Sequence, residues 1–214
     1  MEDHTGDGFR RRSVLRGVVA GVTVVGLGGA SGIGAASDEE TVSIIDVEQL
    51  PDDDAQDYFD AAMEHEHVET FVEETAGDQL ELRPDEVTAF ALKTNDEEFN
   101  ERDPTTVVAP LDGEVGGHCA LLMVDGGDVP NGFGHAVTPE GDHYVSKTYQ
   151  LEDEETTHVD TVELDEGDLD DPDKPNHLYL GGPEGYEEAW PVRFRGDFVE
   201  IEVEGEWEIL HDGG

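Results

Sequence analysis

From Glu86 onward, apolar and polar residues mostly alternate along the chain. A period of two sends successive side chains to opposite faces, which is typical of β-strands with one buried face. This pattern predicts strands at residues 87–94, 105–109, 118–124, 134–138, 143–151, 157–164, 177–180 and 192–210, with a further short strand at 41–47. The segment Pro139–Asp142 contains Gly141 and is expected to form a hairpin turn.

One segment has helical spacing instead. The apolar residues that share one helix face are Ala55, Tyr58, Phe59 and Ala62. We expect a helix over Pro51–Ala76, with the acidic run Asp52–Asp54 at its positive end and Gly77 as its stop. The apolar stripe changes face after Met63, so we expect a bend or a loosened turn at Glu64–His67.

The C-terminal stretch VRFRGDFVEIEVEGEWEIL predicts a three-stranded meander. A two-residue turn at Gly196–Asp197 sets apolar residues opposite apolar residues and arginine opposite glutamate. The resulting cross-strand pairs are Val192 with Ile201, Phe194 with Val199, and Arg193 with Glu200.

For the second turn of the meander we expect a three-residue loop, Glu204–Glu206, because a two-residue turn would set Glu202 opposite Trp207. The expected pairs are then Val203 with Trp207, Ile201 with Ile209, and Glu202 with Glu208. Taken together, the patterns predict a mainly β (α+β) fold, an antiparallel β-sandwich or open barrel with one N-terminal helix.

The stretch RRRSVLRGVVAGVTVVGLGGASGIGAAS near the N-terminus has the organisation of an export signal. It resembles the twin-arginine signal, which has two arginines, a spacer, two apolar residues and a basic residue. The residues that carry the resemblance are Arg11, Arg12, Val14, Leu15 and Arg16. The resemblance implies recognition by the Tat translocase during export.

The segment Gly17–Gly34 is uncharged and contains seven glycines, each of which costs about 1 kcal/mol in a helix relative to alanine. We therefore expect no stable membrane anchor, although the segment is long enough for one. Small residues at Gly34–Ala36 fit cleavage after Ala36, which leaves a single mature domain at residues 37–214. The expected location is secreted or extracellular, or the cell surface if the leader is retained.

The mature segment is extremely acidic. The chain has 55 acidic and 11 basic residues, and 52 acidic and 7 basic residues lie after Ala36, a net charge of −45. High charge with low hydrophobicity favours disorder, and self-repulsion strains a compact state in dilute buffer. The regular alternation favours a fold, and at 1 M salt the screening length falls to about 3 Å. Scarce lysine with abundant Asp and Glu resembles the proteins of extremely halophilic archaea.

The charge also excludes two classes of partner. Nucleic acids and anionic membrane surfaces are bound through basic patches, and the mature segment has too few basic residues to form one. The sequence does not specify a ligand or a protein partner.

Cys119 is the single cysteine, which excludes an internal disulfide. As a nucleophile it would take His135 or His158 as its base, and the order Cys119, His158, Asp171 is similar to that of transglutaminase-like and papain-like thiol enzymes. In those enzymes the cysteine opens a helix, whereas Ala120–Val124 is a strand-like apolar run. We favour the other interpretation, a buried cysteine that acts as a small hydrophobic residue.

Histidines raise the possibility of a metal site. In EHEHVE, His65 and His67 are two residues apart and point in different directions on a helix, although His65 and Glu69 could share a face. The His-Glu-x-x-His spacing of zinc proteases is absent, and DEGDLDDPDK lacks the EF-hand spacing. The histidines that could converge from strands are His118, His135, His143, His158 and His177. We expect no cofactor.

These observations favour an exported, salt-adapted protein with a non-catalytic binding or structural role and an unknown ligand. Two alternatives stay open. One is a thiol hydrolase or transferase that uses Cys119, and the other is a histidine-based metal-binding protein.

Overall fold

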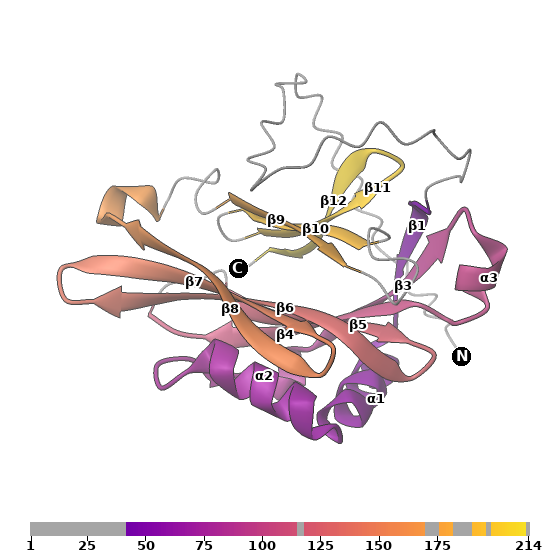
Figure 1. The fold of residues 1–214 in the computed structure, drawn as a ribbon, viewed down its shortest axis with the longest axis horizontal. Coiled ribbons are helices and arrows are strands. Elements are labelled where there is room, and N and C mark those ends of the chain that lie inside the picture. Colours follow the sequence, from indigo (N-terminus) through magenta and orange to yellow (C-terminus); the bar gives the residue numbers. More distant parts are fainter. Residues whose placement is uncertain (1–41, 115–117, 170–175, 182–189, 196–197, 213–214) are drawn as a thin grey trace, which may run out of the picture. The chain divides into compact units, whose positions relative to one another are not determined.

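The computed structural model describes residues 42–114, 118–169, 176–181, 190–195 and 198–212. They belong to one compact unit, Glu40–Gly214, and form an eight-stranded and a four-stranded sheet, both antiparallel (Figure 1). The larger sheet has the order β1-β3-β4-β5-β6-β7-β8, with β2 paired to β4, and the smaller has the order β12-β11-β10-β9. The predicted mainly antiparallel β fold is confirmed, and the sheets do not close into a barrel.

A strand is present at each predicted position, with most ends shifted by a few residues and with β6 much longer than the predicted 134–138. The strands of the larger sheet are β1 (Ile44–Gln49), β2 (Glu81–Leu82), β3 (Thr88–Thr94), β4 (Thr105–Asp112), β5 (His118–Asp125), β6 (Asp128–Glu140), β7 (His143–Glu152) and β8 (Glu155–Leu164). Those of the smaller sheet are β9 (Asn176–Gly181), β10 (Trp190–Arg195), β11 (Phe198–Val203) and β12 (Glu206–Asp212). The hairpin turn predicted at Gly141 joins β6 to β7, with φ of 73° at the glycine.

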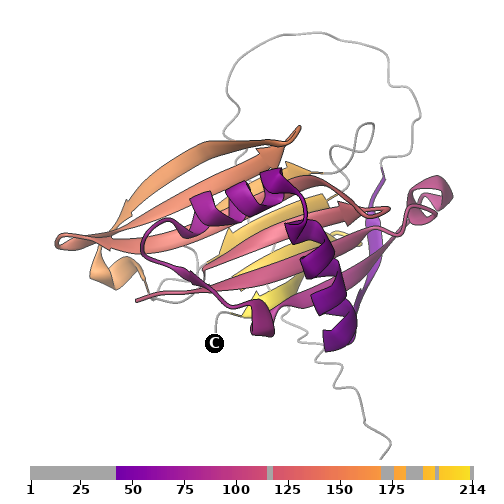
Figure 2. The ribbon, with the colours of Figure 1, turned by 90° about the horizontal axis from the view of Figure 1, so that it is seen from below.

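The predicted helix is two helices, α1 (Asp52–Met63) and α2 (Glu66–Ala76). The chain breaks between them at Glu64 and His65, inside the segment where the apolar stripe changes face. Both helices lie on the same face of the larger sheet (Figure 2). The described residues also include a short α-helix, α3 (Glu97–Asn100), and two short 3-10 helices, η1 (Pro84–Glu86) and η2 (Glu166–Asp168). No helix in the described ranges has the length and apolar character needed to cross a membrane.

The larger sheet separates two hydrophobic cores. On the helix side, Phe59 and Phe71 pack with Leu122 of the sheet. On the other side, the smaller sheet contributes Trp190 and Phe194 to a core shared with the larger sheet, whose side chains include Leu121, Met123 and Phe133. This arrangement explains the alternation: in β5, odd-numbered residues face the smaller sheet and even-numbered residues face the helices.

The first turn of the meander has the predicted register. Val192 pairs with Ile201, Phe194 with Val199, and Arg193 with Glu200. These three pairs put the apolar side chains of β10 and β11 on the inner face, where they are buried.

The predicted second turn is wrong. Glu204 and Gly205 form a two-residue turn with φ of 50° and 80°, and Glu202 lies opposite Trp207. The Glu204 N–H donates a hydrogen bond to the Ile44 carbonyl of β1 (2.8 Å), which fixes this shorter turn. In this register Leu210 is on the same side of the sheet as Ile201, and it is buried in the core. A bulge at Leu210 then shifts the register by one residue, so that Val199 pairs with His211. The expected pair of Glu202 with Glu208 does not form, because Glu208 lies opposite Ile201.

Candidate functional site

Cys119 and His135, the thiol and one of its candidate bases, lie directly opposite each other on β5 and β6. Residues in such positions point to the same face of the sheet, here toward the smaller sheet. Both side chains have 0% exposure. The His135 ring stacks on Phe194, with 5.0 Å between the ring centroids and 16° between the planes. The fold therefore places the thiol and the imidazole side by side, inside the core between the two sheets.

The surroundings of Cys119 oppose nucleophilic chemistry. Burial raises the pKa of the Cys119 thiol far above its ordinary value, because an apolar interior disfavours the thiolate. The thiolate is the reactive form, and a reactive cysteine has to be reachable from solvent. Cys119 meets neither condition, and it fills space in the core as a small hydrophobic residue does.

The other predicted partners of Cys119 do not join it. His158 lies on β8, and strands β6 and β7 separate it from β5, a distance of about 14 Å across three strand spacings. Its ring contacts Tyr149, which packs toward the helices, so His158 lies on the opposite face of the sheet. Its Nε2 lies 2.7 Å from the Thr161 hydroxyl oxygen. Asp171 lies outside the described residues.

The register brings two unpredicted residues into line with Cys119 and His135. Thr148 of β7 lies opposite His135, and Asp160 of β8 lies opposite Thr148. The Thr148 hydroxyl is fully buried and has no hydrogen-bond partner among the described residues, whereas Asp160 is exposed and accepts a hydrogen bond from the Thr161 N–H. Counting outward from the Gly141 turn would have found Thr148. The bulge that sets Asp160 in place has no such signal in the sequence.

The histidines do not assemble a metal centre. His65 lies at the break between the helices and His67 in the first turn of α2, with 5.3 Å between their ring centroids. His118 is buried, and its Nδ1 accepts a hydrogen bond from the Val137 N–H (3.0 Å). His143 lies 3.5 Å from Asp142, and the side chain of His177 lies outside the described part. In the part of the chain that the structure describes, no three His, Cys, Asp or Glu side chains, Glu69 included, gather closely enough to hold a metal ion.

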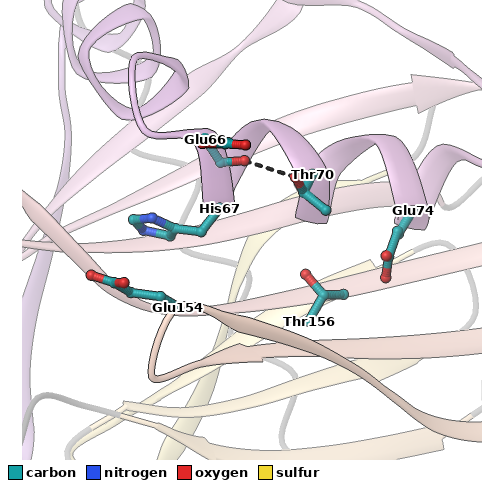
Figure 3. A pocket seen from close by; sticks show the side chains of 6 residues that line it. All are labelled: Glu66, His67, Thr70, Glu74, Glu154 and Thr156. Atoms are coloured by element: carbon teal, nitrogen blue, oxygen red, sulfur yellow. Dashed lines mark hydrogen bonds between the residues drawn. The ribbon is translucent and has the colours of Figure 1, made fainter.

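A polar groove of about 350 Å³ runs between α2 and the turn that joins β7 to β8 (Figure 3). It is lined by Glu66, His67, Thr70, Glu74, Glu154 and Thr156. The Thr70 hydroxyl donates to the Glu66 carbonyl (2.8 Å) and is therefore already satisfied within the helix. Three carboxylates give the groove an affinity for positively charged groups in general.

Sequence reasoning identified His67 of this groove but not the other five residues. Four of the six lining residues are on α2, within the predicted helix. Their spacing does not indicate that a β-hairpin lies beside them. Asp153 and Glu154 form that hairpin's turn with φ of 52° and 62°, although neither is glycine or asparagine. Because two-residue hairpin turns are recognised in a sequence mainly by glycine or asparagine, this turn could not be predicted.

Comparisons of the chain with models of protein families, with curated proteins and with solved structures found no match.

Proposed function

We propose that the protein is exported through the Tat pathway and works outside the cell, in concentrated salt, in a binding or structural role without catalysis. The observation that carries the non-catalytic part is the enclosure of Cys119 and His135 between the two sheets. Their positions suit a thiol enzyme, because they are cross-strand neighbours. Their burial does not, because substrate cannot reach them and the thiolate is disfavoured.

The acidic surface supports the salt-adapted part of the proposal. The mature segment carries 52 acidic and 7 basic residues. In the described part of the chain, two partly buried ion pairs involve arginine: Arg102 with Asp125, and Arg193 with Glu200. A further pair joins Arg83 with Asp112, and both of its side chains are exposed. Most carboxylates therefore have no cationic side chain available to them. Screening by salt is the remaining way to reduce their mutual repulsion.

The leader supports export. Arg11 and Arg12, with Val14, Leu15 and Arg16 behind them, fit the twin-arginine pattern, and Ala36 closes a run of small residues suited to cleavage.

Export is tested by replacing both arginines of the pair. The double variant Arg11→Lys, Arg12→Lys is expected to remain inside the cell as the full-length chain, whereas the unaltered protein appears outside with its N-terminus at Ser37. Arg10→Lys is the matched control, since Arg10 lies outside the pair, and it should be exported normally. An exported form whose N-terminus maps before Ser31, or normal export of the double variant, would contradict this part of the proposal.

A further inference from the structure

Three strands at the edges of the two sheets each contain one residue more than their neighbour can match. In β1, β8 and β12 the register shifts by one residue, and the extra residues are Ile45, Val159 and Leu210. The fourth edge strand, β9, has a regular ladder. Among the other described ladders one is irregular, β5–β6, close to its turn at Gly126 and Gly127. The β-bulges of this fold therefore lie mostly at the edges of its sheets.

β8 presents a long open edge. It is ten residues long and ends the larger sheet, with β7 on its one paired side. Residues 157–161 are all exposed. They include His158, which faces the helix side of the sheet, and Asp160, which faces the other side. Neither the helices nor the smaller sheet therefore covers the middle of β8, whereas at the opposite edge the Glu204 N–H donates a hydrogen bond to the Ile44 carbonyl of β1.

An open edge offers unpaired N–H and C=O groups to any extended strand, and charged side chains are a common protection against such pairing. β8 carries Glu155, Asp160 and Glu163. Paired strands lie about 4.8 Å apart, and the screening length at 1 M salt is about 3 Å, so carboxylates on two approaching edges are largely screened from each other. Apolar contacts persist under these conditions. Charge alone therefore protects the edge of β8 poorly in concentrated salt.

Two side-chain contacts hold the bulge of β8 in place. Because Val159 is not matched to a residue of β7, His158 and Thr161 come to the same face of the sheet. The His158 Nε2 lies 2.7 Å from the Thr161 hydroxyl oxygen. The Thr161 N–H donates to an Asp160 carboxylate oxygen (2.8 Å), so this backbone donor is not available to a further strand. The bulge is thus fixed from both sides, and one N–H group of the strand is already occupied.

We infer that the bulge at Val159 blocks the pairing of β8 with a strand of a second copy, so that the protein stays a monomer in concentrated salt. The groups that a regular strand directs to one side repeat every two residues. The extra residue breaks this repeat in the middle of β8, so a regular partner strand can match the groups before Val159 or those after it, but not both.

This protection depends on geometry and does not weaken as salt is added. It also explains why a valine is 46% exposed in so acidic a chain, since Val159 is the residue that the ladder leaves over. The inference rests on the proposed high-salt environment, where charge no longer keeps the chains apart.

A variant that lacks Val159 tests the inference. The deletion makes β8 regular and leaves the register unchanged on both sides, with His158 opposite Tyr149 and Asp160 opposite Thr148. In about 3 M KCl, light scattering should show the unaltered mature protein as a monomer at every concentration. The variant lacking Val159 should associate, with its mean mass at least doubling as its concentration rises. Val159→Ala is the matched control, because it keeps the extra residue, and it should remain a monomer.

Three results would overturn the inference. They are a folded variant lacking Val159 that is monomeric at every concentration, association of Val159→Ala to the same extent as the deletion, and association of the unaltered protein with slower hydrogen exchange of the β8 amides. Each of these leaves the proposed function standing, whereas a chain that is unfolded in 3 M KCl would contradict the proposed function itself.

If the variant lacking Val159 does not fold, a variant of unchanged length gives a second test. The double variant His158→Ala, Asp160→Ala removes both contacts that fix the bulge and frees the Thr161 N–H, so it should associate in the same assay. Glu155→Ala, Thr157→Ala is its control, because it removes one carboxylate from the same strand and leaves both contacts in place. Equal association of the two double variants, or none in either, would contradict the inference.

Discussion

Gly134 of β6 and Thr75 of α2 show how closely the helix layer approaches the sheet. A Cβ atom built on Gly134 would lie 2.2 Å from the Thr75 hydroxyl oxygen and 2.6 Å from its methyl carbon. Thr75 has little freedom to move away, because it is buried and its hydroxyl donates to the Phe71 carbonyl (2.8 Å). The glycine is therefore required by the close packing of α2.

Gly134→Ala is expected to lower the free energy of unfolding by about 1–3 kcal/mol, the usual cost of an overpacked site. Gly167→Ala is its control, since no atom lies within 4 Å of a Cβ built there and its φ is not in the left-handed region. Chemical denaturation of both variants in concentrated salt measures the difference. Equal stability of the two variants would show that α2 does not pack on β6 as described.

Single residues also mark how far sequence reasoning reached. The interpretation of Cys119 as a core residue rested on the apolar run that follows it, and the burial of Cys119 agrees with that interpretation. The proximity of His135 to Cys119 could not be read from a spacing of sixteen residues, because it depends on the register of the β5–β6 hairpin. The sequence suggested candidate catalytic residues, and the strand register determines which of them lie next to each other.

At the scale of elements, the two-residue turns of the β7–β8 and β11–β12 hairpins both begin with an acidic residue, but only the second has glycine at its second position. The β11–β12 turn has Gly205 in its second position, with φ of 80°. The β7–β8 turn has Glu154 there, with φ of 62°, and Asp153 before it with φ of 52°. A non-glycine residue in the left-handed region costs about 1–2 kcal/mol. The β7–β8 turn, beside the polar groove, is therefore less stable than the same turn would be with residues that favour positive φ.

Replacing this turn by the pair that suits it should stabilise the hairpin. The double variant Asp153→Asn, Glu154→Gly is expected to raise the free energy of unfolding by about 1 kcal/mol, because asparagine and glycine adopt positive φ readily. Glu155→Gly serves as the control, because this neighbouring residue is in a strand and glycine there should be destabilising. Thermal unfolding of the three proteins checks this, and a double variant no more stable than the parent would contradict it.

Elements were predicted best where one physical signal dominated. The break between α1 and α2 followed from the apolar stripe, which cannot change face within one straight helix. The second meander turn was mispredicted because a two-residue turn and a three-residue loop differ by one residue, and a bulge can absorb that residue later in the strand. The contact that decides between them, from the Glu204 N–H to the Ile44 carbonyl, joins residues far apart in the sequence.

At the scale of the whole molecule, two opposing effects determine the stability of the fold: the two hydrophobic cores stabilise it, and repulsion among the carboxylates destabilises it. The cores lie on opposite faces of the larger sheet and involve the helices and the smaller sheet. The repulsion acts over the entire surface and weakens as salt is added. We therefore expect the sandwich, with Cys119 inside it, to be held closed by concentrated salt and to open at low ionic strength.

The rate of alkylation of Cys119, measured against pH in about 3 to 4 M KCl and again after dilution into low salt, tests this most directly. The account predicts slow labelling in high salt, because the thiol is fully buried and burial raises its pKa, and fast labelling in low salt, because the sandwich opens. Circular dichroism on the same samples should show the sheet present in the first and lost in the second. Fast labelling of the folded protein in high salt, with an apparent pKa well below the free value of about 8.5, would contradict the account and make Cys119 a reactive thiol. Slow labelling of a protein that stays folded at low salt would contradict the dependence on salt.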